Sequence, residues 1–184
     1  MRVISGKYGG RSIKGKMPPG VRPTTDKSRE SLFSTLDNYI YFENKKVLDC
    51  YAGSGLVGVE FLSRGAIHCT FIEKNFKPIS VIKQFTSDIN LDKESFTIVK
   101  SDVLAFLKNT NEKYNIIFSD APYHLETGSE IVSIVSEKKL LQHEGFLIIE
   151  TDSKEEIEYS DEYILVKQKK FGVSKLTILE YSNQ

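Results

Sequence analysis

The chain has 184 residues, of which 40% are hydrophobic and 27% charged, which is enough for one domain with a substantial core. No apolar run approaches the ~20 residues that a membrane-spanning helix needs. Residues 1–6 also lack the apolar core of a signal peptide. These features argue against an integral membrane protein, and we expect a cytoplasmic one.

The formal net charge of zero hides an asymmetry along the chain. Residues 1–30 contain eight basic and two acidic side chains, so an N-terminal arm of charge +6 precedes a body of charge −6. A basic arm on an acidic body is a candidate for binding a polyanion. The alternative is a solvated, partly mobile terminus.

The first expected elements are a hairpin and a helix. A short hairpin is predicted over residues 2–14, around the glycine-rich turn at 6–10. The prolines of the loop 17–23 then prevent a regular strand or helix. Thr24 or Thr25 follows and can cap the N-terminus of the first helix.

The rest of the chain alternates between strand-like and helix-like stretches. Strands are expected at 46–51, 67–73, 96–100, 115–120, 145–151, 162–168 and 174–181. Helices are expected at 56–64, 78–90, 102–109 and 128–141, with one short helix at 153–158. Such alternation is typical of a mostly parallel sheet covered on both faces.

The last two strands should be antiparallel, because the link at 169–173 is too short for a parallel crossover. The predicted fold class is therefore α/β: a Rossmann-like, doubly wound, mostly parallel seven-stranded sheet with an antiparallel C-terminal strand and a basic N-terminal hairpin. No long linker or repeat is visible. We expect one domain, with an arm at 1–24 and a catalytic core at 25–184.

The two cysteines, Cys50 and Cys69, each lie in an apolar, strand-like run. Thiols in such surroundings are usually buried small hydrophobic groups. No Cys/His spacing matches a zinc site. The sequence therefore predicts no metal.

A glycine-rich turn at residues 53–58 follows the first strand and opens a helix. Gly53, Gly55 and Gly58 satisfy the G-x-G-x-x-G spacing of nucleotide-cofactor loops. The missing side chains allow a ligand to approach the backbone closely. The spacing alone fits an NAD protein and an S-adenosylmethionine protein equally well.

Three acids placed at or after strand ends favour S-adenosylmethionine. Asp49 precedes the glycines, where its charge would repel a pyrophosphate and attract the ammonium of a methionine moiety. Glu73 ends the second strand and can accept hydrogen bonds from a ribose diol. Asp102 follows the third strand and could accept one from an adenine amine. A helix cap or a turn is the structural alternative for Asp49.

The fourth strand ends in Asp120-Ala121-Pro122-Tyr123. Asp120 and the carbonyl of Ala121 could accept the two hydrogens of an exocyclic amine and free its lone pair for methylation. Tyr123 could stack on an extruded base. The alternative is a simple strand-ending turn. The segment Glu150-Thr151-Asp152 ends the fifth strand, where it would either shape the pocket rim or cap the next segment.

The chain resembles the RsmD family of bacterial 16S ribosomal RNA guanine-N2 methyltransferases, within the class I S-adenosylmethionine-dependent enzymes. The resemblance covers nearly the whole chain. The segments that carry it are 2–11, 22–33, 48–55 and 71–73.

The resemblance implies methylation of one guanosine of the small-subunit RNA, which could lie within an assembly particle, with no membrane partner. The assigned cofactor-binding residues are Asp49, Ala52, Gly53, Gly55, Glu73, Asp102 and Val103. The assigned target-amine residues are Asp120, Ala121, Pro122 and Tyr123. The residues expected to bind RNA are Arg2, Lys7, Arg11, Arg22 and Arg29.

One position departs from the family pattern, because Ala121 stands where the family usually has proline. The backbone carbonyl survives the change, although ordering alanine costs about 0.4–1 kcal/mol more in backbone entropy.

Three alternatives to this function remain open. They are methylation of another DNA or RNA amine, an NAD-dependent oxidoreductase, and a non-catalytic RNA-binding relative, the last of which Ala121 supports.

Overall fold

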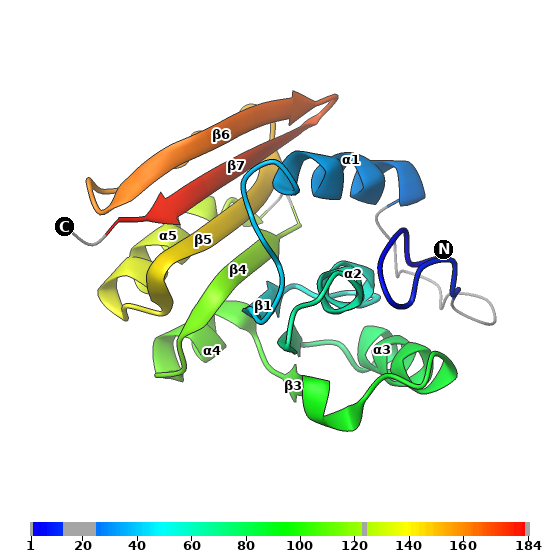
Figure 1. Ribbon diagram of the computed structural model, residues 1–184. Coiled ribbons are helices and arrows are strands. Elements are labelled where there is room, and N and C mark those ends of the chain that lie inside the picture. Colours follow the sequence, from blue (N-terminus) through cyan, green and yellow to red (C-terminus); the bar gives the residue numbers. More distant parts are fainter. Residues whose placement is uncertain (1, 13–24, 123–124, 183–184) are drawn as a thin grey trace. The chain divides into compact units, whose positions relative to one another are not determined.

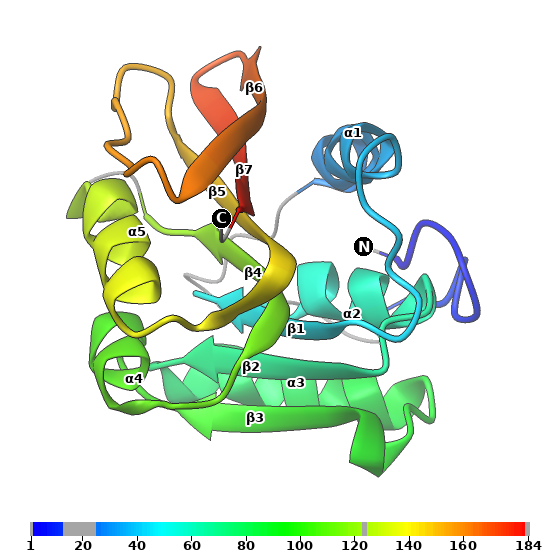
Figure 2. The ribbon, with the colours of Figure 1, turned by 60° about the vertical axis from the view of Figure 1, so that its left-hand side comes forward.

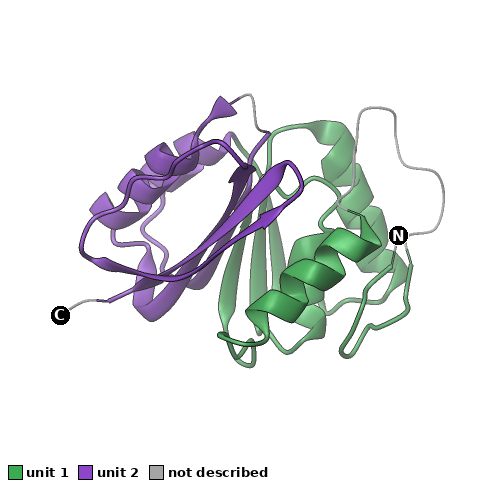
Figure 3. Ribbon diagram, turned by 90° about the horizontal axis from the view of Figure 1, so that it is seen from above, with its two compact units in different colours: residues 1–101 green, residues 102–184 purple. Residues whose placement is uncertain are grey.

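A computed structural model describes residues 2–12, 25–122 and 125–182. The chain forms two compact units, residues 1–101 and 102–184 (Figure 3). The single catalytic domain expected from the sequence stays a prediction.

Unit 1 contains three parallel strands in the order β3-β2-β1. They are β1 (Lys46–Cys50), β2 (His68–Glu73) and β3 (Phe96–Lys100), the last preceded by a short 3-10 turn, η1 (Lys93–Ser95). Three helices accompany them: α1 (Asp26–Leu36), α2 (Leu56–Ser63) and α3 (Phe76–Asp88). Helix α2 packs on β1 and β2, and α3 on β2 and β3 (Figures 1 and 2).

Local sequence explains how the helices of unit 1 begin and what they bury. Thr25 caps α1, since its hydroxyl accepts the N–H of Ser28 at 3.1 Å. Helix α3 starts two residues earlier than expected, because a proline such as Pro78 is tolerated in a first turn, where its missing N–H costs nothing. Phe33 and Phe61 meet edge-on, with ring centroids 4.8 Å apart, and join the helices in one aromatic core.

Unit 2 contains four strands in the order β4-β5-β7-β6. They are β4 (Tyr114–Asp120), β5 (Leu141–Asp152), β6 (Tyr163–Phe171) and β7 (Ser174–Tyr181). The pair β4–β5 is parallel, whereas β7 is antiparallel to both β5 and β6. Helices α4 (Val103–Asn109) and α5 (Gly128–Glu137) lie side by side, and α5 packs on β5 (Figure 2).

Along the whole sheet the strand order is β3-β2-β1-β4-β5-β7-β6. The expected fold class, a mostly parallel seven-stranded sheet with an antiparallel C-terminal strand, is thereby confirmed. The order steps outward in one direction from β1 and then in the other from β4, as in doubly wound folds.

Several predicted boundaries are wrong. The helix expected at 128–141 ends at Glu137, because Lys139 adopts a left-handed φ of 50° and redirects the chain into a longer β5. The short helix expected at 153–158 is absent; Ser153 instead donates its N–H to the carbonyl of Val173, in the turn between β6 and β7. The expected N-terminal hairpin has a single bridge, between Arg2 and Ser12, and its remaining residues 13–14 lie outside the described part.

Candidate functional site

The glycine loop joins β1 to α2 through a sharply turned backbone. Tyr51, Gly53 and Gly55 adopt positive φ angles of 57°, 53° and 74°. The Gly55 N–H donates to the carbonyl of the buried Ala52 at 2.7 Å, which closes the turn. A Cβ added at Gly53 would have no heavy atom closer than 3.8 Å, so the loop presents open backbone there. This fits a site where a ligand approaches the main chain closely.

The carboxylate of Asp49 faces α2. Its Oδ2 accepts the N–H of Gly58 at 3.0 Å, and the residue is only 1% exposed. Gly58 is the third residue of α2, and the first N–H groups of a helix have no acceptor within it. Gly55, at the N-cap, supplies no side chain, so Asp49 acts as a remote cap. Its predicted contact with a methionine ammonium stays a prediction.

Glu73, at the end of β2, holds the loop from the side. Its Oε2 accepts the N–H of Gly53 at 3.2 Å, and its Oε1 accepts the N–H of Asn75 at 2.8 Å. A carboxylate oxygen has two lone pairs, so each can accept a second hydrogen bond from a ribose hydroxyl. The residues present in unit 1 therefore fit the adenosine end of the predicted cofactor.

The other two predicted cofactor residues, Asp102 and Val103, belong to unit 2. Asp102 is exposed and caps α4, with its Oδ1 accepting the N–H of Ala105 at 3.2 Å. Val103 is buried as the first residue of that helix. The remaining predicted cofactor residues all belong to unit 1: Asp49, Ala52, Gly53, Gly55 and Glu73.

The predicted acceptor residues lie at the carboxyl end of β4. Asp120 is half-buried there, Ala121 is buried and Pro122 is exposed. The carbonyl of Pro122 accepts the N–H of Leu125 at 2.9 Å, so the motif turns sharply out of the strand. Tyr123, the predicted stacking residue, lies outside the described residues.

Sequence reasoning missed the partner of Asp120. The parallel register of β4 and β5 sets Asp120 opposite Glu150. Burial, and secondly the charge of Glu150, raise the pKa of Asp120 to about 7. Burial likewise raises the pKa of Glu150, against a hydrogen bond from Ser174 that lowers it. The sequence signal was the acidic segment Glu150-Thr151-Asp152 at the end of the fifth strand, and no pattern revealed which residue of β4 it would face.

The basic arm is docked on α2 through a buried carboxylate. Glu60 is fully buried, and its two oxygens accept the N–H groups of Ile4 and Ser5 at 2.7 and 3.0 Å. The ring of the buried Tyr8 lies beneath Lys7 and Arg11, whose cationic groups are each 5.3 Å from its centroid. Residues 2–12 of the arm are therefore held on α2 within unit 1 and present exposed basic groups.

The five residues expected to bind RNA have different surroundings. Arg2, Lys7 and Arg11 are exposed. The assignment of Arg29 is wrong, because its side chain is fully buried: its guanidinium donates to the Arg2 carbonyl and pairs with Asp26 at 3.1 Å. Arg29 thus joins the arm to α1. Arg22 lies outside the described residues.

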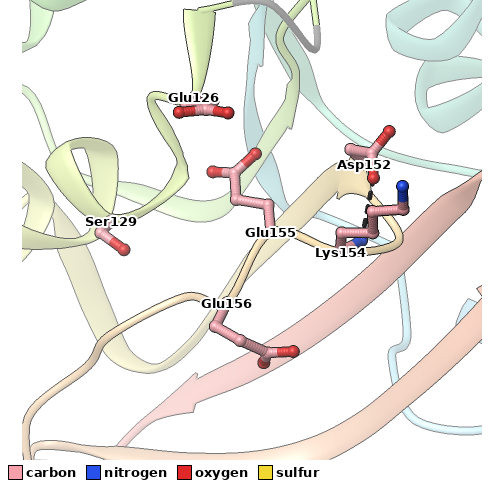
Figure 4. A pocket seen from close by; sticks show the side chains of 6 residues that line it. All are labelled: Glu126, Ser129, Asp152, Lys154, Glu155 and Glu156. Atoms are coloured by element: carbon pink, nitrogen blue, oxygen red, sulfur yellow. Dashed lines mark hydrogen bonds between the residues drawn. The ribbon is translucent and has the colours of Figure 1, made fainter.

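Unit 2 contains a pocket of about 530 Å³ that the sequence did not suggest (Figure 4). It is lined by Glu126, Ser129, Asp152, Lys154, Glu155 and Glu156. Four carboxylates against one lysine would repel phosphate, so this pocket does not fit an RNA backbone. Within residues 2–12, 25–122 and 125–182, no group of three or more His, Cys, Asp or Glu residues is arranged to hold a metal. No helix in the same ranges is long and apolar enough to cross a membrane.

The fold and the loop together define the class of protein. A sheet of this strand order, with an antiparallel β7, a glycine loop after β1 and an acid ending β2, is the class I methyltransferase fold. The yhhF protein of Escherichia coli has the same fold, with a TM-score of 0.87 and 25% identity over 100% of this chain and 99% of that one. SMU.776, solved in complex with SAH, shares it with a TM-score of 0.71 at 14% identity, over 83% of this chain and 49% of that one.

The chain belongs to the family described as "Conserved hypothetical protein 95", whose model matches residues 1–180. This is the RsmD family of S-adenosylmethionine-dependent methyltransferases, as the resemblance predicted. Among its relatives is Ribosomal RNA small subunit methyltransferase D of Buchnera aphidicola, 36% identical over 168 residues that cover 91% of this chain and 86% of that protein. The alternative of an NAD-dependent oxidoreductase is therefore rejected.

Proposed function

We propose that the chain transfers a methyl group from S-adenosylmethionine to the exocyclic N2 amine of a guanosine in 16S ribosomal RNA. The observation that carries the proposal is the half-buried Asp120, which ends β4 and is followed by Ala121-Pro122 in a chain of this family. The relative in Buchnera aphidicola, named as a small-subunit ribosomal RNA methyltransferase, supports the choice of RNA.

The acceptor residues have to make a conjugated amine nucleophilic. Two hydrogen-bond acceptors on the amine hydrogens draw the nitrogen toward a tetrahedral geometry and free its lone pair. The Asp120 carboxylate and the Ala121 carbonyl are the two acceptors, and Pro122 restricts the backbone of Ala121. Tyr123 stacks on the extruded base.

The donor residues are those around the glycine loop. S-adenosylmethionine, when bound, supplies an electrophilic methyl on a sulfonium sulfur. Glu73 receives the ribose hydroxyls in addition to the N–H groups of Gly53 and Asn75 that it already accepts. Asp102 and Val103 contact the adenine, and Asp49 keeps α2 in place or reaches the methionine ammonium. The SAH in the fold neighbour SMU.776 is consistent with a cofactor of this type.

The exposed basic groups of the arm bind RNA phosphates. Arg2, Lys7 and Arg11 are exposed, and the arm that carries them is fixed to α2 by Glu60. A fixed basic surface loses less conformational entropy on binding than a mobile tail would. The expected partner is ribosomal RNA, within a small-subunit assembly particle, and the expected location is the cytoplasm.

The test is methyl transfer from labelled cofactor to small ribosomal subunits, or to their RNA, from a strain that lacks this activity. We expect incorporation as N2-methylguanosine. Methyladenosine or methylcytidine in the product would instead identify another amine as target. RNA binding with intact cofactor binding but without any transfer would identify a non-catalytic relative.

The role of Asp120 is tested in the same assay. We expect Asp120→Ala to lower turnover by at least about 100-fold, the usual effect of removing one group that stabilises a transition state. Cofactor affinity, measured by calorimetry, should change little, because Glu73 and the glycine loop are untouched. Asp161→Ala, at an exposed acid of the same unit, is the matched control.

A further inference from the structure

Two carboxylates stand side by side at the ends of β4 and β5. Asp120 and Glu150 are register partners in this parallel pair. Neighbouring strands lie about 5 Å apart, and paired residues point to the same face. Both residues are half-buried, so water screens their mutual repulsion only partly.

The other groups around the pair do not neutralise it. Asp152, two residues along β5, shares the face of Glu150 and adds a further acid. Lys175 of β7 pairs with Thr151 and therefore lies on the opposite face. Ser174 offers a hydroxyl to Glu150 but no charge. In the same row, β7 places Leu176 beside Glu150, and the first base, Lys169 of β6, stands one strand further out, about 10 Å from Glu150. Among the described residues of the adjacent strands β4, β5 and β7 in unit 2, the charged groups on the face of the pair are acids.

We propose that Glu150 acts with Asp120 as the proton acceptor for the target amine. The role rests on the methyl transfer proposed above and assigns a further catalytic residue to it. When the amine nitrogen uses its lone pair to form the N–C bond, sulfur keeps the electron pair of the broken S–C bond. The nitrogen then carries one proton too many, and that proton passes to a carboxylate oxygen of the pair.

An isolated carboxylate is a poor acceptor at neutral pH, because its pKa is near 4. A general base works best when its pKa lies near the working pH. Burial raises the pKa of Asp120 to about 7, and the charge of the neighbouring Glu150 adds to the effect. The pair then titrates as one system.

The experiment compares wild type, Glu150→Gln and Glu150→Asp in methyl transfer over a range of pH. Removing the Glu150 charge should lower kcat by about 10-fold. The loss is smaller than the roughly 10²–10⁴-fold effect of removing a whole general base, because Asp120 remains. The acid limb of the kcat profile should move to lower pH, and KM for RNA should stay unchanged. Glu150→Asp should restore the wild-type limb in part. Glu144→Gln, at an exposed acid of the same strand, is the matched control.

The outcomes separate this inference from the function on which it rests. Wild-type turnover with an unchanged kcat and pH profile in Glu150→Gln overturns the inference alone. Absence of turnover in wild type overturns the proposed function. In that case, carbon NMR titration of the Asp120 carboxyl still tests whether the two carboxyls are coupled. The pKa of Asp120 should be lower in Glu150→Gln than in wild type, and an unchanged pKa would overturn the proposed coupling of Asp120 and Glu150.

Discussion

Asp49 on β1 accepts a hydrogen bond from the backbone N–H of Gly58 on α2, at 3.0 Å. The contact depends on the absence of a side chain at Gly58. A Cβ there would lie 2.8 Å from Asp49 Oδ2, 2.7 Å from Cys69 Sγ and 2.3 Å from Phe71 Cε1. The glycine that completes the sequence motif therefore serves helix–strand packing, directly behind the cofactor loop.

We expect Gly58→Ala to destabilise the protein by about 1–3 kcal/mol, the usual cost of overpacking a core. Helix propensity alone predicts the opposite sign, because alanine favours a helix over glycine by about 1 kcal/mol. Urea denaturation measures the difference. Gly172→Ala is the comparison: nothing lies within 4 Å of its Cβ position, so only its φ of 61° is strained. A stabilised Gly58→Ala variant would show that α2 can move away from β2 at no cost.

Glu60 holds the basic arm, so its replacement should affect RNA binding more than cofactor binding. Glu60→Ala leaves the N–H groups of Ile4 and Ser5 and the Nε of Arg64 without their acceptor, whereas Arg64 keeps its pairing with Asp37. Leaving a buried donor without its acceptor in this way costs about 1–3 kcal/mol. We expect weaker RNA binding and a shallower dependence of affinity on salt, as fewer phosphate contacts form. Filter binding at several salt concentrations measures both.

The control for the arm is Glu30→Ala, at an exposed position of α1. It should leave stability and RNA affinity unchanged. If Glu60→Ala unfolds the chain, Glu60→Gln, which keeps the shape and one acceptor, replaces it in the same assay. Unaltered RNA affinity in a folded Glu60 variant would mean that the arm does not bind RNA.

The raised pKa of Asp120 makes stability depend on pH. Burial, and next the Glu150 charge, raise this pKa from 3.8 to about 7. Between those values the folded state binds more protons than the unfolded state, so the free energy of unfolding falls as pH rises from about 4 to about 7. Asp120→Asn removes this loss. Above pH 7, we expect the free energy of unfolding of the variant to exceed that of wild type by about 1–3 kcal/mol. This difference should shrink as the pH falls toward 4.

Denaturation midpoints of wild type and Asp120→Asn at pH 5, 6, 7 and 8 measure that difference. Asp161→Asn, at an exposed acid, should follow wild type throughout. A difference that is constant across this range would mean that Asp120 is ionised in the folded protein already at pH 5.

Both cysteines should be unreactive in the folded protein. Cys50 and Cys69 are free and fully buried. Burial raises the pKa of both thiols, and the charge of Asp49 adds to the effect. Because the thiolate is the reactive form, a thiol reagent at pH 8 should label neither cysteine in the native state and both in denaturant. Rapid native labelling would reveal local opening of β1 or β2.

Much of this architecture follows from local patterns in the sequence. The alternation of apolar strands with amphipathic helices predicts the sheet, and the short link before β7 predicts its antiparallel pairing. Glycines directly after an apolar strand predict the loop. Helix ends were harder to predict, because Lys139 takes up a left-handed conformation that charged residues seldom adopt, and no sequence signal marks it.

The fold class, the cofactor loop and the acid that ends β4 follow from local sequence, since each depends on residues close together in the chain. The burial of Arg29, the attachment of the arm by Glu60 and the pairing of Glu150 with Asp120 emerge only in the folded chain. The contacts behind these three findings, Arg29 with Arg2, Glu60 with Ile4 and Glu150 with Asp120, join residues 27 to 56 positions apart. Long-range pairing is set by how whole elements pack and not by local preference, so no short motif can record it.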